Sequence, residues 1–388
     1  MMPPHSLLCS LWCVLLLGVG SLLLLVHLQH LTDSVPQQNT GVPVLEAPEW
    51  PMEKLPVAAR QVNDIPAGLF PMSPPILRLC SDPLVGIQQP VTKRRRKQLL
   101  KSALSGGEES LQQRRTQESR RHLLTATCSR FHPVHSIQRA TLQQVSRIYV
   151  EDRYRLLYCE VPKAACSNWK RVLMMLGGRA HSIQDIPHDM AHYSNQLRRL
   201  DSYDRAGIAE RLRSYTKVLF TREPFERLVS AFRDKFESPN SYYHPVFGRA
   251  IISRYRANAT GSALKTGAGV TFREFVQYLL DMHRPVGMDI HWEQVSKLCS
   301  PCLIPYNFIG KFESLEEDAN FLLHSIGAPD NITFPDFKDR NPLEERTSSR
   351  ITREYFSQLN GTERQKVFEF YYRDYLMFSY PKPFPDLH

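Results

Sequence analysis

Two stretches decide the fold of this chain: residues 156–170, LLYCEVPKAACSNWK, and residues 218–230, VLFTREPFERLVS. Each begins as an apolar strand candidate, passes through a turn that carries a cation, Lys163 or Arg222, and continues into a helix candidate. This arrangement presents backbone N–H groups and positive charge to an anion at the N-terminus of a helix. Two such segments in one chain predict a ligand with phosphate at both ends.

The rest of the C-terminal region continues the alternation of strands and helices. Two capping boxes, Thr271 with Glu274 and Ser314 with Glu317, open apolar-striped segments that read as helices. Strands interleaved with helices indicate an α/β domain with a largely parallel central sheet flanked by helices. The predicted strands are 156–161 and 217–221, and the predicted helices are 168–176, 224–236, 271–280, 314–325 and 363–375.

The first stretch is not a Walker A loop, because it lacks both the glycine pair and the Lys-Ser/Thr pair. Lys163 follows the strand directly, and small side chains, which let a phosphate approach the backbone, come next. Ser167 adds a hydroxyl donor. The alternative is an ordinary strand-to-helix turn whose lysine faces water.

The second stretch favours the anion-site interpretation. Arg222 follows a strand, and Ser230 lies eight residues later, about two helical turns on. Both side chains could reach one phosphate. The alternative is that Arg222 and Arg227 form surface ion pairs with Glu223 and Glu226, which are common and weak. The two segments in this order, about 60 residues apart, form a much stronger signal than either alone.

The N-terminus carries an apolar segment, residues 7–28, without a formally charged residue. Roughly 20 residues suffice to cross a bilayer as one helix. A cleaved signal peptide is the alternative, but no small-residue cleavage site follows directly. Three N-glycosylation sequons come later in the chain, at Asn258, Asn331 and Asn360. We therefore expect a single-pass type II membrane protein whose main part lies in the secretory lumen.

The chain divides into four expected parts. A cytoplasmic tail, 1–6, precedes the transmembrane signal-anchor, 7–28. Recurring prolines and a basic run predict an extended lumenal stem over 29–140. The catalytic domain is expected over 141–388.

The chain's net charge of +10 favours polyanionic ligands. Part of it lies in the basic run at 93–97, which is better explained as a solvated linker. A nucleic-acid partner is not expected, because the predicted topology places this run in the lumen.

Six cysteines follow the apolar segment. Cys299 and Cys302 could form a redox pair, half of a zinc site or structural disulfides. A zinc site would need a second close ligand pair, which the sequence does not offer. A structural disulfide, local or to a distant cysteine, is the preferred interpretation.

The region from about Arg147 to the C-terminus resembles the membrane-bound Golgi carbohydrate sulfotransferases, in the group that modifies galactosamine residues and includes the related glucuronyl enzyme. Within it, the chain is most similar to the N-acetylgalactosamine 4-sulfotransferases that act on terminal GalNAc of N-glycans. The stretches that carry the resemblance are 154–172, 221–236, 240–247, 287–292 and 298–302.

The resemblance implies a P-loop-like nucleotide-binding domain on the Golgi membrane. Its expected reaction is sulfuryl transfer from 3′-phosphoadenylyl sulfate to the 4-hydroxyl of GalNAc, without a metal. The alternatives are a chondroitin or dermatan GalNAc 4-sulfotransferase and a glycan-binding pseudoenzyme. The oligomeric state stays open.

The resemblance also implies the donor-site residues. Lys163 matches the loop lysine that would contact the bridging oxygen, while Arg222 and Ser230 match the pair that would hold the 3′-phosphate. The full expected set is Pro162, Lys163, Ala164, Ala165, Cys166, Ser167 and Asn168 in the first turn, and Arg222, Glu223, Pro224, Phe225, Glu226, Arg227, Leu228, Val229 and Ser230 in the second.

The acceptor hydroxyl needs a general base, and histidine suits near-neutral pH. His291 is our candidate, because it precedes the Cys-x-x-Cys in the acceptor half of the chain. His188 and His192 are rivals, and a nearby Glu or Asp could serve instead.

Overall fold

The computed structural model describes residues 107–131, 140–336 and 345–388. The predicted tail, the membrane segment 7–28 and most of the predicted stem lie outside these ranges. Within them, no helix is both long and apolar enough to cross a membrane.

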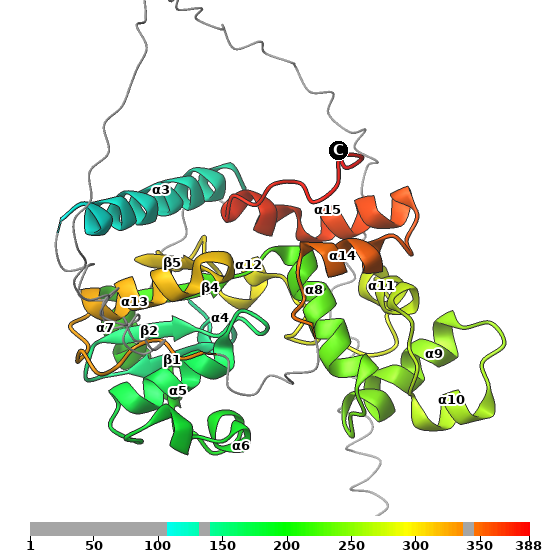
Figure 1. Ribbon diagram of the computed structural model, residues 1–388, viewed down its shortest axis with the longest axis horizontal. Coiled ribbons are helices and arrows are strands. Elements are labelled where there is room, and N and C mark those ends of the chain that lie inside the picture. The colour runs from blue at the N-terminus through cyan, green and yellow to red at the C-terminus, as the bar shows by residue number, and fades with distance from the viewer. Residues whose placement is uncertain (1–106, 132–139, 337–344) are drawn as a thin grey trace, which may run out of the picture. The chain divides into compact units, whose positions relative to one another are not determined.

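A five-stranded sheet forms the centre of the described chain, in the order β3-β1-β2-β4-β5 (Figure 1). Strand β4 pairs parallel with both β2 and β5, whereas β1 pairs antiparallel with both β2 and β3. The sheet is therefore mixed, and β2, β4 and β5 form the parallel part that the sequence predicts. A short turn joins β1 to β2, and only an antiparallel pair can be closed so tightly. The strands are β1 Ile148–Glu151, β2 Leu156–Cys159, β3 Arg198–Arg199, β4 Thr216–Thr221 and β5 Phe308–Lys311.

Helices cover both faces of the sheet. On one face, Tyr158 and Phe220 pack with Trp169 of α5 (Cys166–Leu176) and with the apolar side of α13 (Leu315–Ser325). On the other, alternate strand residues such as Leu157 and Leu219 pack with other helices. The helices of this second face are α3 (Glu108–Phe131), α7 (Arg205–Ser214) and α12 (Val295–Leu298).

A second core contains no strand and is built from helices and the turns between them. Phe225 of α8 stacks on Phe356 of α14, with ring centroids 4.0 Å apart and planes 2° apart. Trp292 is fully buried in the same cluster. The helices of this cluster are α8 (Pro224–Phe232), α9 (Arg249–Tyr255), α11 (Phe272–Leu280), α14 (Ser349–Phe356) and α15 (Gly361–Met377). The remaining α-helices are α4 (Leu142–Val145), α6 (His188–His192) and α10 (Gly261–Thr266).

The observed helix ends refine the predicted ones. The Thr271–Glu274 capping box is present, and Asn360 with Glu363 forms another at the start of α15. The Ser314 capping box is wrong, because the Ser314 hydroxyl donates to Asp318 instead of accepting a helix N–H. Helix α8 ends at Phe232, earlier than predicted, and a π-helical turn over Arg233–Glu237 follows it.

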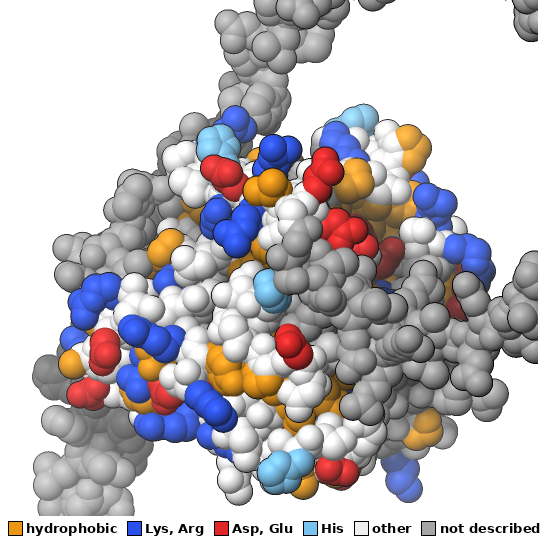
Figure 2. Space-filling model, turned by 60° about the vertical axis from the view of Figure 1, so that its left-hand side comes forward, with side chains coloured by type: hydrophobic (Ala, Val, Ile, Leu, Met, Phe, Trp, Pro, Cys, Tyr) orange, Lys and Arg blue, Asp and Glu red, His pale blue; other side chains and the backbone are white. Residues whose placement is uncertain are grey.

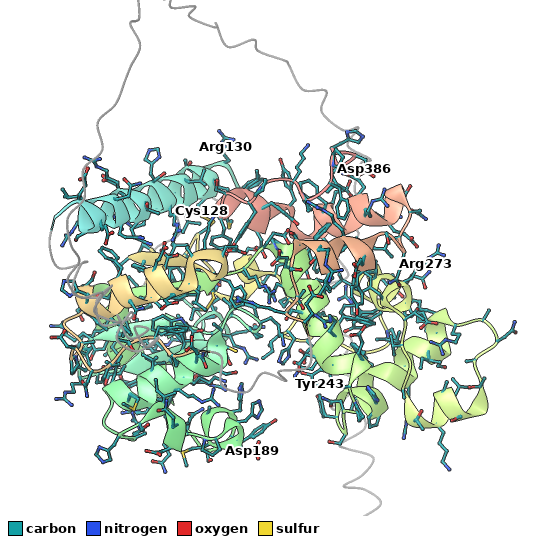
Figure 3. All side chains as sticks on the ribbon, in the orientation of Figure 1. Cys128, Arg130, Asp189, Tyr243, Arg273 and Asp386 are labelled. Carbon is teal, nitrogen blue, oxygen red and sulfur yellow. A yellow bond between two sulfur atoms is a disulfide. The ribbon has the colours of Figure 1, made fainter. Side chains whose placement is uncertain are left out.

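Helix α3 falls within the predicted stem, yet it packs against the sheet (Figure 1). Gln117 donates to the Ile309 carbonyl at 3.2 Å and accepts the Ile309 N–H at 2.9 Å, as a neighbouring strand would. The edge strand β5 is thereby covered, which protects it from pairing with another chain. A disulfide joins Cys128 of α3, labelled in Figure 3, to Cys302.

Both cysteines of the Cys-x-x-Cys pair thus have distant partners, since Cys299 bonds to Cys159 of β2. The predicted structural disulfide is confirmed, in its long-range form. Cys166 is a buried free thiol.

Replacing Cys128 and Cys302 together by Ser is expected to lower the free energy of unfolding by about 2–5 kcal/mol, because the bridge closes a long loop. Thermal unfolding of the protein, secreted without its first 31 residues, measures this. Unchanged melting would show that α3 contributes no stability through the bridge.

Candidate active site

The two signature turns meet at one edge of the sheet. They follow β2 and β4, which are adjacent parallel strands, so both turns leave at the same, carboxyl edge. Arg222 connects them directly, since its Nη1 donates to the Lys163 carbonyl at 3.4 Å. The prediction that the two segments act at one place is supported by this contact.

The first turn presents a bare helix N-terminus. Lys163 and Ala165 both adopt the left-handed conformation, with φ of 68° and 66°, and Ala165 precedes α5 without a side-chain cap. The first hydrogen bond into the helix runs from the Trp169 N–H to the Ala165 carbonyl at 3.1 Å. The backbone N–H groups of Cys166, Ser167 and Asn168 precede it, and such groups bind anions.

Not every side chain of this turn faces a ligand. Val161, Ala164 and Asn168 are buried, and Asn168 Nδ2 donates to the backbone carbonyls of Pro335 and Asp336 at 3.4 and 3.3 Å. The side chain of Asn168 is therefore occupied by these carbonyls, and only its backbone N–H is left for an anion.

The Lys163 ammonium lies 3.1 Å from Asp234 of the π-helical turn. Asp234 also pairs with Lys235 at 3.0 Å. Burial lowers the pKa of Lys163, and the neighbouring Asp234 partly offsets this. Burial would raise the pKa of Asp234, but Lys163 and Lys235 together hold it well below its usual range. A fixed carboxylate thus holds the cation beside the turn.

Arg222 is a buried cation, and two of its three guanidinium nitrogens contact other protein groups. Its Nη2 donates to the Thr347 carbonyl at 2.7 Å and lies 3.6 Å from the Glu226 carboxylate. Its guanidinium stands 4.2 Å from the Phe312 ring centroid. Burial lowers the pKa of Arg222 to about 10, so it stays cationic at neutral pH. Its buried Nε lacks a hydrogen-bond partner in the described part of the chain, which fits an anion-binding role.

The residues of the second signature that follow Arg222 begin helix α8 and anchor it in the core. Glu223 caps α8 by accepting the Glu226 N–H at 2.7 Å, and Pro224 occupies the first turn. Phe225, Leu228 and Val229 are buried in the helical core, so their side chains cannot reach a ligand there. These three residues were predicted to bind the donor, but their side chains can affect it only indirectly, by fixing the position of α8.

The buried Arg227 connects the donor side to the predicted base. It donates to the His291 carbonyl at 2.9 Å and to the Glu293 carbonyl. Ser230 is half-buried on the same helix, one turn before Arg233, which donates to the Thr347 hydroxyl at 2.9 Å. Thr347 therefore marks a point where Arg222 and the end of α8 come together.

His291 has the surroundings of a base. Its Nδ1 lies 2.7 Å from Asp289 Oδ1 and 2.9 Å from the Tyr243 hydroxyl, labelled in Figure 3. Burial lowers the pKa of His291; Asp289 opposes this, whereas the positive charges of Lys235 and Lys163 add to it. With Nδ1–H donated to Asp289, Nε2 keeps a free lone pair.

One network links His291 to the turn lysine. Lys235 stands 4.8 Å from the Tyr243 ring centroid and pairs with Asp234, which in turn holds Lys163. The predicted base and the predicted turn lysine therefore lie within electrostatic reach of one another. The rival histidines have other partners: His192 contacts Ser167 of the first turn, and His188 is an exposed residue that stacks on His192.

Sequence reasoning missed Asp234, Lys235 and Tyr243. A weak signal existed, because the Asp-Lys pair follows the second signature and Tyr243 lies within a stretch that resembles the family. Nothing in the sequence shows that their side chains converge on Lys163 and His291.

The predicted glycosylation sites Asn258, Asn331 and Asn360 are all exposed. Among the described residues, no group of three or more His, Cys, Asp or Glu could hold a metal ion.

A mixed sheet between helices, with a bare helix N-terminus and two cations at one edge, defines a nucleotide-binding α/β protein. The chain belongs to the sulfotransferase family, whose model matches residues 146–381. The predicted sulfotransferase is thereby confirmed, and the family implies 3′-phosphoadenylyl sulfate as the sulfuryl donor.

Known proteins similar to this chain are also sulfotransferases. The chain is 51% identical to mouse carbohydrate sulfotransferase 8, over 98% of this chain and 97% of the relative. It is 60% identical to human carbohydrate sulfotransferase 9 over 69% of this chain and 61% of the relative. Rat carbohydrate sulfotransferase 11 is 41% identical, over 69% of this chain and 76% of the relative. No solved structure gives a significant match.

Proposed function

We propose that this protein transfers a sulfuryl group from 3′-phosphoadenylyl sulfate to the 4-hydroxyl of N-acetylgalactosamine, in terminal GalNAcβ1-4GlcNAc on glycoprotein N-glycans. One observation carries the donor side: Lys163 and Arg222 meet at the bare N-terminus of α5. The carbohydrate acceptor is supported by the relatives, which are named carbohydrate sulfotransferases. The choice of GalNAc rests on the resemblance of residues 154–172 and 287–292.

Different residues would bind the two phosphate ends of the donor. The backbone N–H groups at the start of α5 and the Ser167 hydroxyl would bind the 5′-phosphosulfate, while Arg222 and Ser230 would bind the 3′-phosphate. As the S–O bond to the 5′-phosphate breaks, Lys163 would neutralise the charge that develops on the bridging oxygen. Fixed positive charge at this point lowers the barrier without reorganisation.

His291 would act on the acceptor. Its Nε2 would take the proton of the sugar hydroxyl while the hydroxyl oxygen bonds to sulfur. Asp289 would hold the ring in the tautomer that leaves Nε2 unprotonated, and would stabilise the imidazolium that forms. The products are a sulfated sugar and adenosine 3′,5′-bisphosphate.

A chondroitin or dermatan acceptor is the second candidate. A hollow of about 720 Å³ lies beside the segment that carries Tyr243, and His244, Arg249 and Lys265 are among its lining residues. Basic side chains there would suit a polyanionic chain. On the face that Figure 2 shows, Lys and Arg side chains lie among Asp and Glu side chains.

The two acceptors are distinguished in one assay. The secreted lumenal chain is incubated with labelled 3′-phosphoadenylyl sulfate and either a GalNAcβ1-4GlcNAc glycoside or desulfated chondroitin. Transfer to the 4-hydroxyl of the glycoside supports the proposal. Preference for chondroitin would move the acceptor to proteoglycans, and transfer to neither would overturn the acceptor assignment.

Ser230→Ala is expected to raise the donor KM about 10-fold with little change in the acceptor KM, because one hydrogen bond to a charged phosphate is lost. Ser230 is half-buried, so the substitution leaves the core intact. Initial rates at varied donor concentration measure the effect. An unchanged donor KM would remove Ser230 from the site.

We also propose a Golgi-membrane location with the catalytic domain in the lumen. Two disulfides fit an oxidising compartment, and all three sequons are exposed. Digestion of the cell-made protein with an N-glycosidase is expected to increase its gel mobility. Unaltered mobility would contradict a glycosylated lumenal domain.

A further inference from the structure

Ser167, in the phosphate-binding turn, has a protein partner that the reaction scheme does not use. Its hydroxyl oxygen lies 2.7 Å from Nε2 of His192, which ends the short helix α6. The other ring nitrogen of His192, Nδ1, lies 3.5 Å from the Lys170 ammonium. His192 thus stands between a buried cation and the hydroxyl that faces the donor.

The chemistry of Lys170 fixes the direction of both hydrogen bonds. An ammonium group can only donate, so Nδ1 of His192 must accept. A neutral imidazole carries one proton, which therefore lies on Nε2 and is donated to the Ser167 oxygen. Because that oxygen accepts from His192, the hydroxyl proton of Ser167 is left to point toward another acceptor.

Lys170 is itself held in place. It pairs with Glu160 at 2.6 Å, and both side chains are almost fully buried, with 5% and 6% exposed. Arg147 approaches the same carboxylate at 3.8 Å. Burial and the positive charge of Lys170 lower the pKa of His192 to about 4, which keeps the ring neutral through the secretory pathway. In the chain of contacts Glu160–Lys170–His192–Ser167, each hydrogen bond therefore has a fixed donor: Lys170 donates to Glu160 and to His192, and His192 donates to Ser167. We call this chain of contacts the relay.

We propose that His192 is a positioning residue for donor binding: it holds the Ser167 oxygen as an acceptor, so that the hydroxyl proton points at the 5′-phosphate group of the nucleotide. This inference rests on the proposed function of the turn. It assigns His192 to the donor, and not to proton abstraction from the acceptor.

A double-mutant cycle tests the relay. The dissociation constant of adenosine 3′,5′-bisphosphate is measured by calorimetry for the wild type, His192→Ala, Ser167→Ala and the double variant. Each single change is expected to weaken binding about 10- to 150-fold, the range for one hydrogen bond to a charged group. The double variant is expected to bind no more weakly than Ser167→Ala, because His192 acts through that hydroxyl.

Two further variants guard against a structural effect. His192→Gln can accept from Lys170 and donate to Ser167, so it is expected to restore most of the affinity. Asp189→Ala changes an exposed residue of the same helix, labelled in Figure 3, and is expected to bind normally. Thermal unfolding confirms that each variant is folded.

Distinct results would overturn the proposal. Fully multiplicative losses in the double variant would show that His192 does not act through Ser167. Unchanged nucleotide affinity with a lost acidic limb in the pH profile of kcat would make His192 the base. Failure of the wild type to bind the bisphosphate would overturn the proposed donor site as well, which separates the two claims.

Discussion

Replacing Lys163 by Ala is expected to reduce kcat for sulfuryl transfer by about 10²- to 10³-fold or more. The lysine ammonium is the cation held at the turn where the leaving group would develop negative charge, and a preorganised charge at such a point is worth this much. The protein is expected to stay folded, because Asp234 keeps Lys235 as a partner at 3.0 Å. Initial rates with labelled donor measure the loss.

Lys235→Ala is the matched control for Lys163. It removes the other cation beside Asp234 and leaves Lys163 in its ion pair, so a smaller loss is expected. Wild-type turnover in a folded, secreted Lys163→Ala protein would contradict the assignment of the turn. Equal losses in both variants would indicate a role for total charge instead of one placed ammonium.

His291→Ala is expected to lower kcat about 10²- to 10⁴-fold, the usual contribution of a positioned general base. In the wild type, kcat should fall as the pH drops through the pKa of His291, because protonation occupies the lone pair. That limb is expected below pH 6.5, the ordinary histidine value, since burial and two neighbouring lysines lower the pKa. A pH profile of kcat measures both.

Asp289→Asn supplies the finer test of this base. It removes the carboxylate that raises the pKa of His291, so the acidic limb is expected to move to lower pH while kcat falls. A limb that stays in place in Asp289→Asn, or persists in His291→Ala, would mean that another group accepts the proton.

The sequence was enough to predict the elements that form the proposed anion site. An apolar run, a cation and a helix pattern occur together at 156–170 and 218–230, and local signals such as Pro224 and the Thr271–Glu274 box mark helix starts. Strand β1 was not among the predicted strands, so its antiparallel pairing with β2 was missed as well. The packing of α3 was missed because its sequence is mostly polar and has no apolar stripe. A few long-range contacts, such as Gln117 with Ile309, hold the helix against the sheet.

The site was only partly predictable for a related reason. Lys163 and Arg222 follow strands, so the parallel arrangement of β2 and β4 alone brings them together. Asp234, Tyr243 and His192 reach the site through tertiary packing, and the sequence carries only weak signals for their place there. The buried Phe225 and Val229 belong to the second signature in sequence but to the core in space.

The central claim is that the two turns form one site for a nucleotide with phosphates at both ends. Calorimetric titration of the protein, secreted without its first 31 residues, with adenosine 3′,5′-bisphosphate and with adenosine 5′-monophosphate tests it most directly. We expect one bisphosphate per chain and binding of the monophosphate weaker by at least about 10-fold, the cost of losing charged contacts to the 3′-phosphate. Equal affinity for the two nucleotides, or no binding of the bisphosphate, would contradict the account.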